Sequence, residues 1–358
     1  MLTIRSINPI PATHLDPDHQ ARMQLFSRYN HELIGGPQWD VDVEANLASA
    51  RTNTEIQRYC WLAELDGVAA GYGNLAINTV DEPEVGDLTI YVAPEHRRQG
   101  AGKGLLAAIN AQAHSLGLSR LTCWLTAAPP AGGATLSPAH GVGAVDADHP
   151  GIRMALSDGF ELGQVERVSR YDFAAPLVDP RDALAQAQSA AGDEYEVITW
   201  SGLADDALLP DLAQLTERMS RDVPSGGLTV TPTTWTAKRI RERDERNLIS
   251  NRFYRSAVRH IPTGQLVALN ELLRDRSNAD AFVDQWDTVV LSEHRGHRLG
   301  MAVKAANILQ VREAEPTATA IITWNAEENR HMLRVNEELG FREILREAAL
   351  EKQLSAEG

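Results

Sequence analysis

Apolar residues recur along the chain with two different periods. Short apolar runs at 59–65 and 68–77 predict a pair of strands, with Leu-Asp-Gly at 65–67 as their turn. Longer periodic stretches at 17–34 and 101–116 predict helices. The other elements expected in the first half are strands at 2–7, 87–93 and 121–127, closing strands within 161–173, and helices at 41–54 and 151–158. Strands outnumber helices and helices lie between some of them, so we expect a mixed α/β fold.

The second half of the chain repeats this pattern. The segment "YVAPEHRRQGAGKGLLAAINA" at 91–111 has a partner, "VLSEHRGHRLGMAVKAANILQ", at 290–310, and each precedes a helical stretch that closes on Gly-Phe. The halves differ in length at 126–151, where Pro, Gly and Ala predict an inserted loop. The second half is expected to contain strands at 196–202, 252–260, 265–274, 281–292 and 319–325, closing strands from Phe341, and helices around 204–220, 232–246, 299–313 and 327–338. We therefore predict two tandem domains, at 1–176 and 193–358, joined by a linker at 177–192.

Composition narrows the class of protein. The chain has 358 residues and a formal net charge of -15, from 49 acidic and 34 basic side chains. This balance argues against a nucleic-acid partner and against attraction to an anionic membrane. The sequence has neither a secretory h-region nor an apolar run long enough to span a bilayer. Cys60 and Cys123 lie in separate apolar stretches and are interpreted as buried thiols in strands. We expect a cytoplasmic protein, either a monomer or a homodimer.

The most informative stretch lies between the strand at 87–93 and the helix at 101–116. Arg97 and Arg98 precede three glycines at alternate positions, Gly100, Gly102 and Gly104. A helix that begins there directs free backbone N–H groups at one point, and glycines allow an anion to approach them closely. The helix dipole and the two guanidinium groups add attraction for an anion. The pattern predicts a diphosphate-binding turn. It fits neither a P-loop, because no hydroxyl follows Lys103, nor a dinucleotide fingerprint, because the glycine spacing differs.

The segment "VAPEHRRQGAGKGLL" resembles motif A of the GCN5-related N-acetyltransferases (GNATs), whose signature Arg/Gln-x-x-Gly-x-Gly/Ala is met by Arg97, Gly100 and Gly102. The helices that end in Gly-Phe resemble motif B of that family in both halves. The resemblance implies two GNAT-like domains, each with a centrally splayed mixed sheet flanked by helices. It implies acetyl-coenzyme A as co-substrate, with its diphosphate on the turn and its pantetheine arm between the splayed strands. The residues implied in coenzyme binding are Ile90, Val92, Arg97, Arg98, Gln99, Gly100, Ala101, Gly102, Lys103 and Gly104 in the first half, and Val289, Leu291, Arg295, Gly296, His297, Arg298, Gly300, Asn325 and Asn329 in the second.

The second half departs from motif A because Arg298 occupies the place of the first glycine. Arg298 either adds a phosphate contact or crowds the turn, since a non-glycine residue disfavours positive φ. Asn329 is assigned to the pantetheine arm by analogy with the family, and an N-terminal helix cap is an equally good interpretation. A half that folds but no longer binds the coenzyme is therefore an open alternative for the second copy.

The chemistry implied by the resemblance is attack of a primary amine of a small molecule on the thioester. Many relatives protonate the leaving thiolate with a Tyr four residues before the motif B glycine, but here that position is Ala155 or Asn336. Neither is an acid, so other groups are needed. The candidates on or before the central strands are Glu84, Asp87 and Tyr91 in the first half and Glu271 and Asp287 in the second. A coenzyme-A-binding module or sensor with one or both sites silent is the alternative function.

The resemblance implies that acceptor specificity comes from the loop after the fifth strand and from the segment between the first two helices. The corresponding loops, 30–40 and 218–228, supply His31 and Trp39 in the first half and Met219 and Asp222 in the second. His140, Asp146, Asp148 and His149 in the inserted loop match no common metal spacing, so we predict no metal site.

Overall fold

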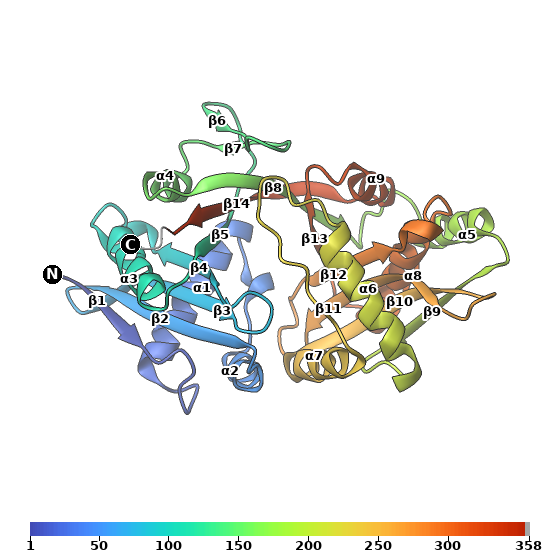
Figure 1. Ribbon diagram of the computed structural model, residues 1–358, viewed down its shortest axis with the longest axis horizontal. Coiled ribbons are helices and arrows are strands. Elements are labelled where there is room, and N and C mark those ends of the chain that lie inside the picture. The colour runs from blue at the N-terminus through green and yellow to red at the C-terminus, as the bar shows by residue number, and fades with distance from the viewer. Residues whose placement is uncertain (355–358) are drawn as a thin grey trace. The chain divides into compact units, whose positions relative to one another are not determined.

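The computed structural model describes residues 1–354 and has the mixed α/β fold expected from the sequence (Figure 1). The chain forms two compact units. The first contains residues 1–166, 225–230 and the C-terminal segment from Leu345; the second contains 167–224 and 231–344. The last strand of the chain therefore belongs to the first unit.

The sheet of the first unit places parallel central strands inside antiparallel ones. Its strands, in order across the sheet, are β1 (Leu2–Ile7), β2 (Ile56–Leu65), β3 (Val68–Asn78), β4 (Val85–Val92), β5 (Arg120–Ala127) and the first-unit part of β14 (Arg342–Gln353). β4 and β5 are parallel, and β14 pairs antiparallel with β5 through Arg346–Gln353. A parallel pair needs a crossover connection, which the helix after β4 supplies.

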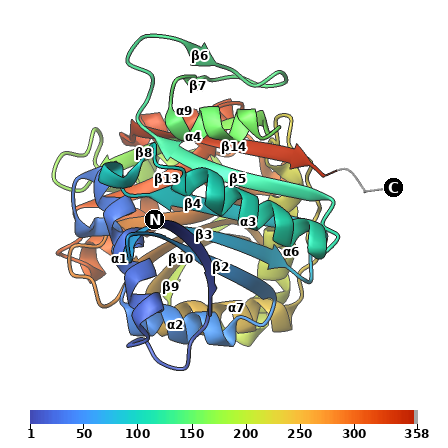
Figure 2. The ribbon, with the colours of Figure 1, turned by 90° about the vertical axis from the view of Figure 1, so that its left-hand side faces the viewer.

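Helices cover both faces of this sheet. They are α1 (Pro17–Ile34), α2 (Val43–Thr52), α3 (Ala101–Ser115) and α4 (Pro150–Ser157). Ile90 and Val92 of β4 pack in the core beneath α3, whereas the ring of Tyr91 lies 5.5 Å from that of Tyr29 on α1. Neighbouring residues of a strand point to opposite faces. α3 and α1 therefore lie on opposite faces, and Figure 2 views the first unit with α3 in front of its strands.

The second unit has the same plan. Its sheet runs through β8 (Glu161–Asp172), β13 (Ala320–Ala326), β12 (Val283–Val290), β11 (Leu266–Asp275), β10 (Asn251–His260) and β9 (Tyr195–Ser201). Its helices are α5 (Pro180–Ala191), α6 (Leu209–Asp222), α7 (Ala237–Ser250), α8 (Leu299–Ala314) and α9 (Arg330–Leu339). Asn270 bonds to Asn307 of α8, while its neighbour Glu271 bonds to Arg243 of α7, so these helices lie on opposite faces.

In both units the central parallel strands separate after a few residues. β4 and β5 pair only from Val85 opposite Arg120 to Leu88 opposite Cys123. β12 and β13 pair only over Val283–Gln285. Beyond these points, the edge of β4 that faces β5 has no strand partner among the described residues, and the same holds for β12. This is the splayed sheet that the family resemblance implied.

Several local predictions need correction. The closing segments 161–173 and 342–353 are single long strands rather than several. The second-half helix expected at 232 begins at Ala237, because Thr236 caps it by accepting from the Arg239 amide. The inserted loop at 126–151 contains a two-residue ladder, β6 (Thr135–Leu136) with β7 (Val145–Asp146). The short helix expected within the linker is α5, at residues 180–191, and it packs against α8. The predicted domain ranges describe repeated sequence, whereas the compact units follow spatial contacts, so those ranges stay a prediction.

Candidate functional site

The turn before α3 has the shape expected of an anion-binding turn. Arg98 and Gly100 both adopt the left-handed conformation, with φ of 64° and 90°. Gly100 is the N-cap of α3, and no side chain within residues 1–354 accepts a capping hydrogen bond from the first amides of the helix. The first amide that finds a backbone acceptor there is that of Gly104, which donates to the Gly100 carbonyl at 2.9 Å. The earlier N–H groups are thus available to an external anion.

Arg97 does not point freely toward this turn. Its Nε donates to the Val92 carbonyl at 2.9 Å, and its Nη2 donates to both carboxylate oxygens of Glu32 at 2.7 and 2.8 Å. Glu32 also accepts from the Tyr91 hydroxyl at 3.2 Å. The arginine therefore ties α1 to the end of β4, and its charge is balanced. Arg98 and Lys103 are exposed at the turn and remain the cations best placed for a phosphate.

The glycines of the turn serve packing as well as conformation. A Cβ atom on Gly104 would lie 2.8 Å from Cγ1 of Ile4, which is closer than such atoms approach, so glycine is needed for α3 to lie against β1. A Cβ on Gly102 would lie 3.2 Å from the sulfur of Met154 on α4. Gly102 thus stands where α3, α4 and the end of β4 converge.

The second unit repeats the turn, but the glycine and the arginine exchange the two left-handed positions. Gly296 and Arg298 occupy its two left-handed positions, with φ of 88° and 56°. Arg298 keeps the left-handed backbone of the turn, and its guanidinium lies 3.2 Å from the Glu338 carboxylate. Arg295 donates to the Val290 carbonyl at 3.3 Å and to Asp222 at 2.8 Å, as Arg97 does to Val92 and Glu32. The backbone of the turn is preserved in both copies.

Residues of the two motif B regions make contacts that stabilise the fold. Asn329 caps α9 by accepting from the Met332 amide at 3.2 Å. Asn336, at the position of the missing Tyr, donates to Asn325 of β13 at 2.6 Å and lines a cavity of about 300 Å³ with Leu333 and Phe341. Ala155 in the first unit is buried. These positions supply no acid.

Two carboxylates of the first unit lie on the sheet face that α1 covers. Asp87 of β4 accepts from the Thr122 hydroxyl at 3.1 Å, at the last rungs where β4 and β5 still pair. Burial raises the pKa of Asp87 to about 6, and the charge of Glu347 adds to this effect. Glu347, on β14, accepts from the Thr126 hydroxyl at 2.7 Å, and burial raises its pKa as well.

Tyrosines stand beside these carboxylates. Burial raises the pKa of Tyr29 to about 12, and its hydroxyl interacts with Thr126. Burial and Glu32 raise the pKa of Tyr91 to about 12. Glu84, by contrast, is exposed, and its backbone carbonyl accepts from the Ser119 amide at 2.9 Å. The structure thus brings Asp87 and Tyr91 together on one face and leaves Glu84 apart.

Tyr29, Glu347 and the two threonines were missed in the sequence. Tyr29 repeats the inward position of Leu25 one helical turn later, a signal that a periodicity argument could have used. Glu347 has no such local signal, since the pairing of Arg346–Gln353 with Arg120–Ala127 joins segments more than 200 residues apart.

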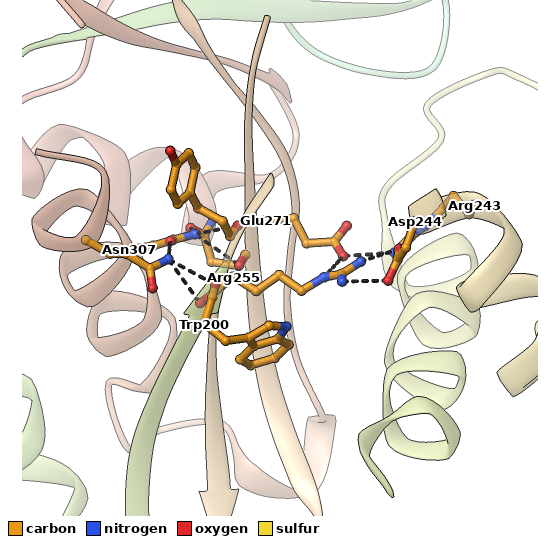
Figure 3. Close-up of polar contacts among 9 residues, drawn as sticks. Trp200, Arg243, Asp244, Arg255, Glu271 and Asn307 are labelled. Atoms are coloured by element: carbon orange, nitrogen blue, oxygen red, sulfur yellow. Dashed lines mark hydrogen bonds and ion pairs between the residues drawn. The ribbon is translucent and has the colours of Figure 1, made fainter. Parts of the chain in front are cut away.

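Of the two candidate carboxylates of the second unit, Glu271 is ion-paired, which distinguishes it from Asp87. Glu271 accepts from Arg255 Nε at 2.8 Å and from Arg243 Nη2 at 2.9 Å, and Arg255 also donates to both oxygens of Asp244 at 2.7 and 2.6 Å (Figure 3). The Glu271, Arg255 and Asp244 side chains are 0% exposed. Burial alone would raise the pKa of Glu271, but Arg243 and Arg255 hold it below its usual value. Burial and Glu271 raise the pKa of Asp287 to about 6.

A second polar network lies on the α8 face of the same sheet. The side-chain amide of Asn307, which is labelled in Figure 3, lies against this sheet. It donates to the Asn270 side chain at 2.9 Å and to the backbone carbonyls of Asn270 and Tyr254. Gln310 donates to the Trp200 carbonyl at 3.1 Å. These bonds hold α8 on the strands. Of the predicted coenzyme contacts, Val289 and Leu291 are buried in the core of this unit.

The predicted acceptor residues are distributed as follows. His31 bonds to Asp40 at 2.8 Å, and the Trp39 carbonyl accepts from Asn30 at 2.8 Å, so both anchor the segment between α1 and α2. A cavity of about 400 Å³ lies beside that segment, and its lining includes Met23, Phe26, Ser27, Asp40 and Val41. Met219 packs against the hydrophobic core of the second unit, and Asp222 pairs with Arg295.

The histidines and aspartates of the inserted loop do not form a metal site in the structure. Within residues 1–354, no group of three His, Cys, Asp or Glu side chains is placed to hold a metal ion. His149 instead caps α4 by accepting from the Gly151 amide at 3.2 Å. None of the helices in this part of the chain has the length and apolar character needed to cross a membrane.

Comparisons with known proteins agree with this geometry. Residues 24–131 match the model of the acetyltransferase (GNAT) family. A tandem GNAT protein from the clavulanic acid biosynthesis pathway is 22% identical, with a TM-score of 0.75 over 100% of both chains. A GCN5-related N-acetyltransferase from Sphaerobacter thermophilus is 14% identical, with a TM-score of 0.61 over 98% of this chain and 95% of that one. No curated protein matches the chain.

Proposed function

Since residues 24–131 match the acetyltransferase (GNAT) family and the whole chain has the fold of a tandem GNAT protein, we propose that this protein transfers an acetyl group from acetyl-coenzyme A to a primary amine of a small molecule. The observation that carries the proposal is the combination of two features at the C-terminal end of β4 in the first unit. β4 and β5 are separated there, and α3, which follows β4, begins without a side-chain cap.

The turn and the splay fit the two ends of the coenzyme. The free amides at the start of α3, with Arg98 and Lys103, would hold the diphosphate. The edge of β4 beyond Leu88 lacks a strand partner, so the amides of a pantetheine arm would pair with it as a strand does. In that arrangement the thioester would lie beside Thr89–Val92, next to the face that carries Asp87.

The reaction needs one proton removed and one supplied. The amine nitrogen attacks the carbonyl carbon, the carbon–sulfur bond breaks, and the nitrogen loses a proton. Asp87, with a pKa of about 6, is ionised at neutral pH and yet more basic than an ordinary carboxylate, which suits it to accept that proton through water. Tyr91 or Tyr29 would return a proton to the thiolate, in place of the missing motif B tyrosine.

The first unit is the better candidate for chemistry. Glu271, one of the two candidate carboxylates of the second unit, is held by Arg243 and Arg255 and has little capacity to take up a proton. Asp287 has a raised pKa of about 6, as Asp87 has, but the charges of Arg243 and Arg255 act on it, whereas the charged groups that act on Asp87 are carboxylates. A second unit that binds a coenzyme or supports the fold without turnover is the alternative that this ion pair favours.

A charge change that keeps shape tests the coenzyme site. Gln99→Glu adds one negative charge at the exposed turn, whereas Gln112→Glu adds the same charge at the far end of α3. We expect Gln99→Glu to weaken acetyl-coenzyme A binding roughly tenfold through repulsion of the diphosphate, and Gln112→Glu to leave it nearly unchanged. Binding is measured by calorimetry, and turnover by thiol release across a panel of amines. Equal affinities in the two variants would refute the site, and binding without thiol release for any amine would favour a binding module.

A further inference from the structure

We propose that Glu347 is a positioning residue of the first unit and that the acceptor is a diamine, whose second ammonium group Glu347 binds while Asp87 serves the reacting amine. The inference rests on the proposed function and names its substrate class. It also assigns a role to the last strand of the chain within the site of the first repeat.

The proposed site lies where β4 and β5 separate, and Glu347 lies opposite Thr126 of β5. Residues Thr122, Trp124 and Thr126 alternate onto one face of β5, and Thr122 contacts Asp87 while Thr126 contacts Glu347. Four residues along a strand span about 13 Å, so the two carboxylates mark two ends of one strip. They remain close enough for the charge of Glu347 to raise the pKa of Asp87.

Neither carboxylate is neutralised within the described chain. Their hydrogen-bond partners are the two threonine hydroxyls, and the other charged group that acts on Asp87 is Glu82. The contrast with the second unit is direct, because there two arginines are buried against Glu271 and Asp244. A partly buried carboxylate without a cation costs stability unless a ligand supplies the charge.

The surroundings suit an alkylammonium chain rather than an anion or a metal. Trp124, between the two threonines, is 41% exposed despite its place in the sheet. The rings of Tyr29 and Tyr91 lie 5.5 Å apart on the same side of the sheet. Aromatic faces attract ammonium groups and also cover methylene chains. A linear aliphatic diamine would pair its two terminal ammonium groups with the two carboxylates, and its methylene chain would contact the aromatic rings.

The test compares α,ω-diaminoalkanes of three to six carbons with monoamines of the same length. Thiol release from acetyl-coenzyme A is measured with the wild-type protein and with Glu347→Gln. We expect the wild type to favour diamines, and Glu347→Gln to raise KM for diamines roughly 10–100-fold with little change in kcat or in the monoamine rates. Glu347→Asp, which keeps the charge, should restore much of the preference.

Glu351 supplies the matched control. It lies on the same strand, but Arg120 already pairs with it at 3.4 Å, so Glu351→Gln should not alter the preference between diamines and monoamines. If the wild type treats diamines and monoamines alike, or Glu347→Gln keeps the preference, the inference is overturned while the acetyltransferase proposal stands. If no amine releases thiol from a protein that binds acetyl-coenzyme A, the proposed function itself fails.

Discussion

The buried ammonium group of Lys304 offers the sharpest test of the physical account of the second unit. Lys304 lies on α8 with 1% of its surface exposed, and its Nζ finds no hydrogen-bond partner among the described residues. The nearest compensation is the ring of Phe341, whose centroid is 5.6 Å away. Burial lowers the pKa of Lys304 from 10.5 to about 7. The folded state therefore binds this proton more weakly than the unfolded state does.

The sign of the effect follows from linkage. Above pH 10.5 the lysine is neutral in both states and costs nothing through its charge; as the pH falls toward 7, the unfolded state gains a proton that the folded state does not. Stability is thus lost at up to about 1.4 kcal/mol per pH unit over that range, and the loss levels off below pH 7 at roughly 4–5 kcal/mol. Lys304→Met keeps the length of the side chain and removes the titration.

The assay is urea unfolding of the wild type and Lys304→Met, followed by far-UV circular dichroism at pH 7, 8 and 9. We expect the variant to be more stable at pH 7, and its advantage to shrink by about 2 kcal/mol between pH 7 and pH 9. Lys103→Met, at an exposed position of the matching helix α3, is the control and should have a small effect throughout. An unchanged advantage across this pH range, or a less stable variant at pH 7, would show that Lys304 is charged and well solvated in the fold.

Two further predictions concern the contrast between paired and unpaired carboxylates. Arg255→Met removes one of the two arginines that pair with Asp244 and Glu271 and leaves both carboxylates buried beside Arg243. It should lower the free energy of unfolding by roughly 3–5 kcal/mol, as measured by urea unfolding at pH 7, and a loss below about 1 kcal/mol would contradict this description of the network. Asp87→Asn should act in opposite directions on stability and activity. The pKa of Asp87 is about 6 in the folded state and 3.8 in the unfolded state, so ionisation of Asp87 lowers the free energy of unfolding as the pH rises from about 4 to 6. The variant avoids this loss and should be roughly 2–3 kcal/mol more stable than the wild type at pH 7.5. The same variant should lose most of its kcat, and wild-type activity should fall as the pH drops through about 6; a variant with full thiol release would exclude Asp87 as the base.

Local sequence signals predicted the elements that local interactions determine. The helix at 17–34 has the bounds expected because Asp16 accepts from the amides of Asp18 and His19, Pro17 occupies the first turn, and Gly35 ends the helix at φ 78°. The turn at 97–104 was predicted because its glycines and arginines are consecutive in sequence. The separation of the central parallel strands was predicted from the family resemblance, which rests on those same residues.

Long-range pairing could not be predicted in the same way. The segment 225–230 belongs to the first unit, where the Thr229 carbonyl accepts from Arg120 and its hydroxyl donates to Glu351, although its sequence was assigned to the acceptor side of the second half. Glu347 reaches Thr126 for the same reason, since the partner of a strand is set by tertiary packing rather than by its own pattern. The left-handed Arg298 shows the reverse case, in which a residue that local sterics disfavour keeps the backbone of a glycine.

A crystal structure of the full chain with acetyl-coenzyme A tests the central claim most directly. The account predicts the diphosphate on the amides of residues 100–103 and the thioester beside Thr89–Val92, on the side of β4 that faces β5. A coenzyme bound elsewhere in the first unit, or in the second unit alone, would contradict it.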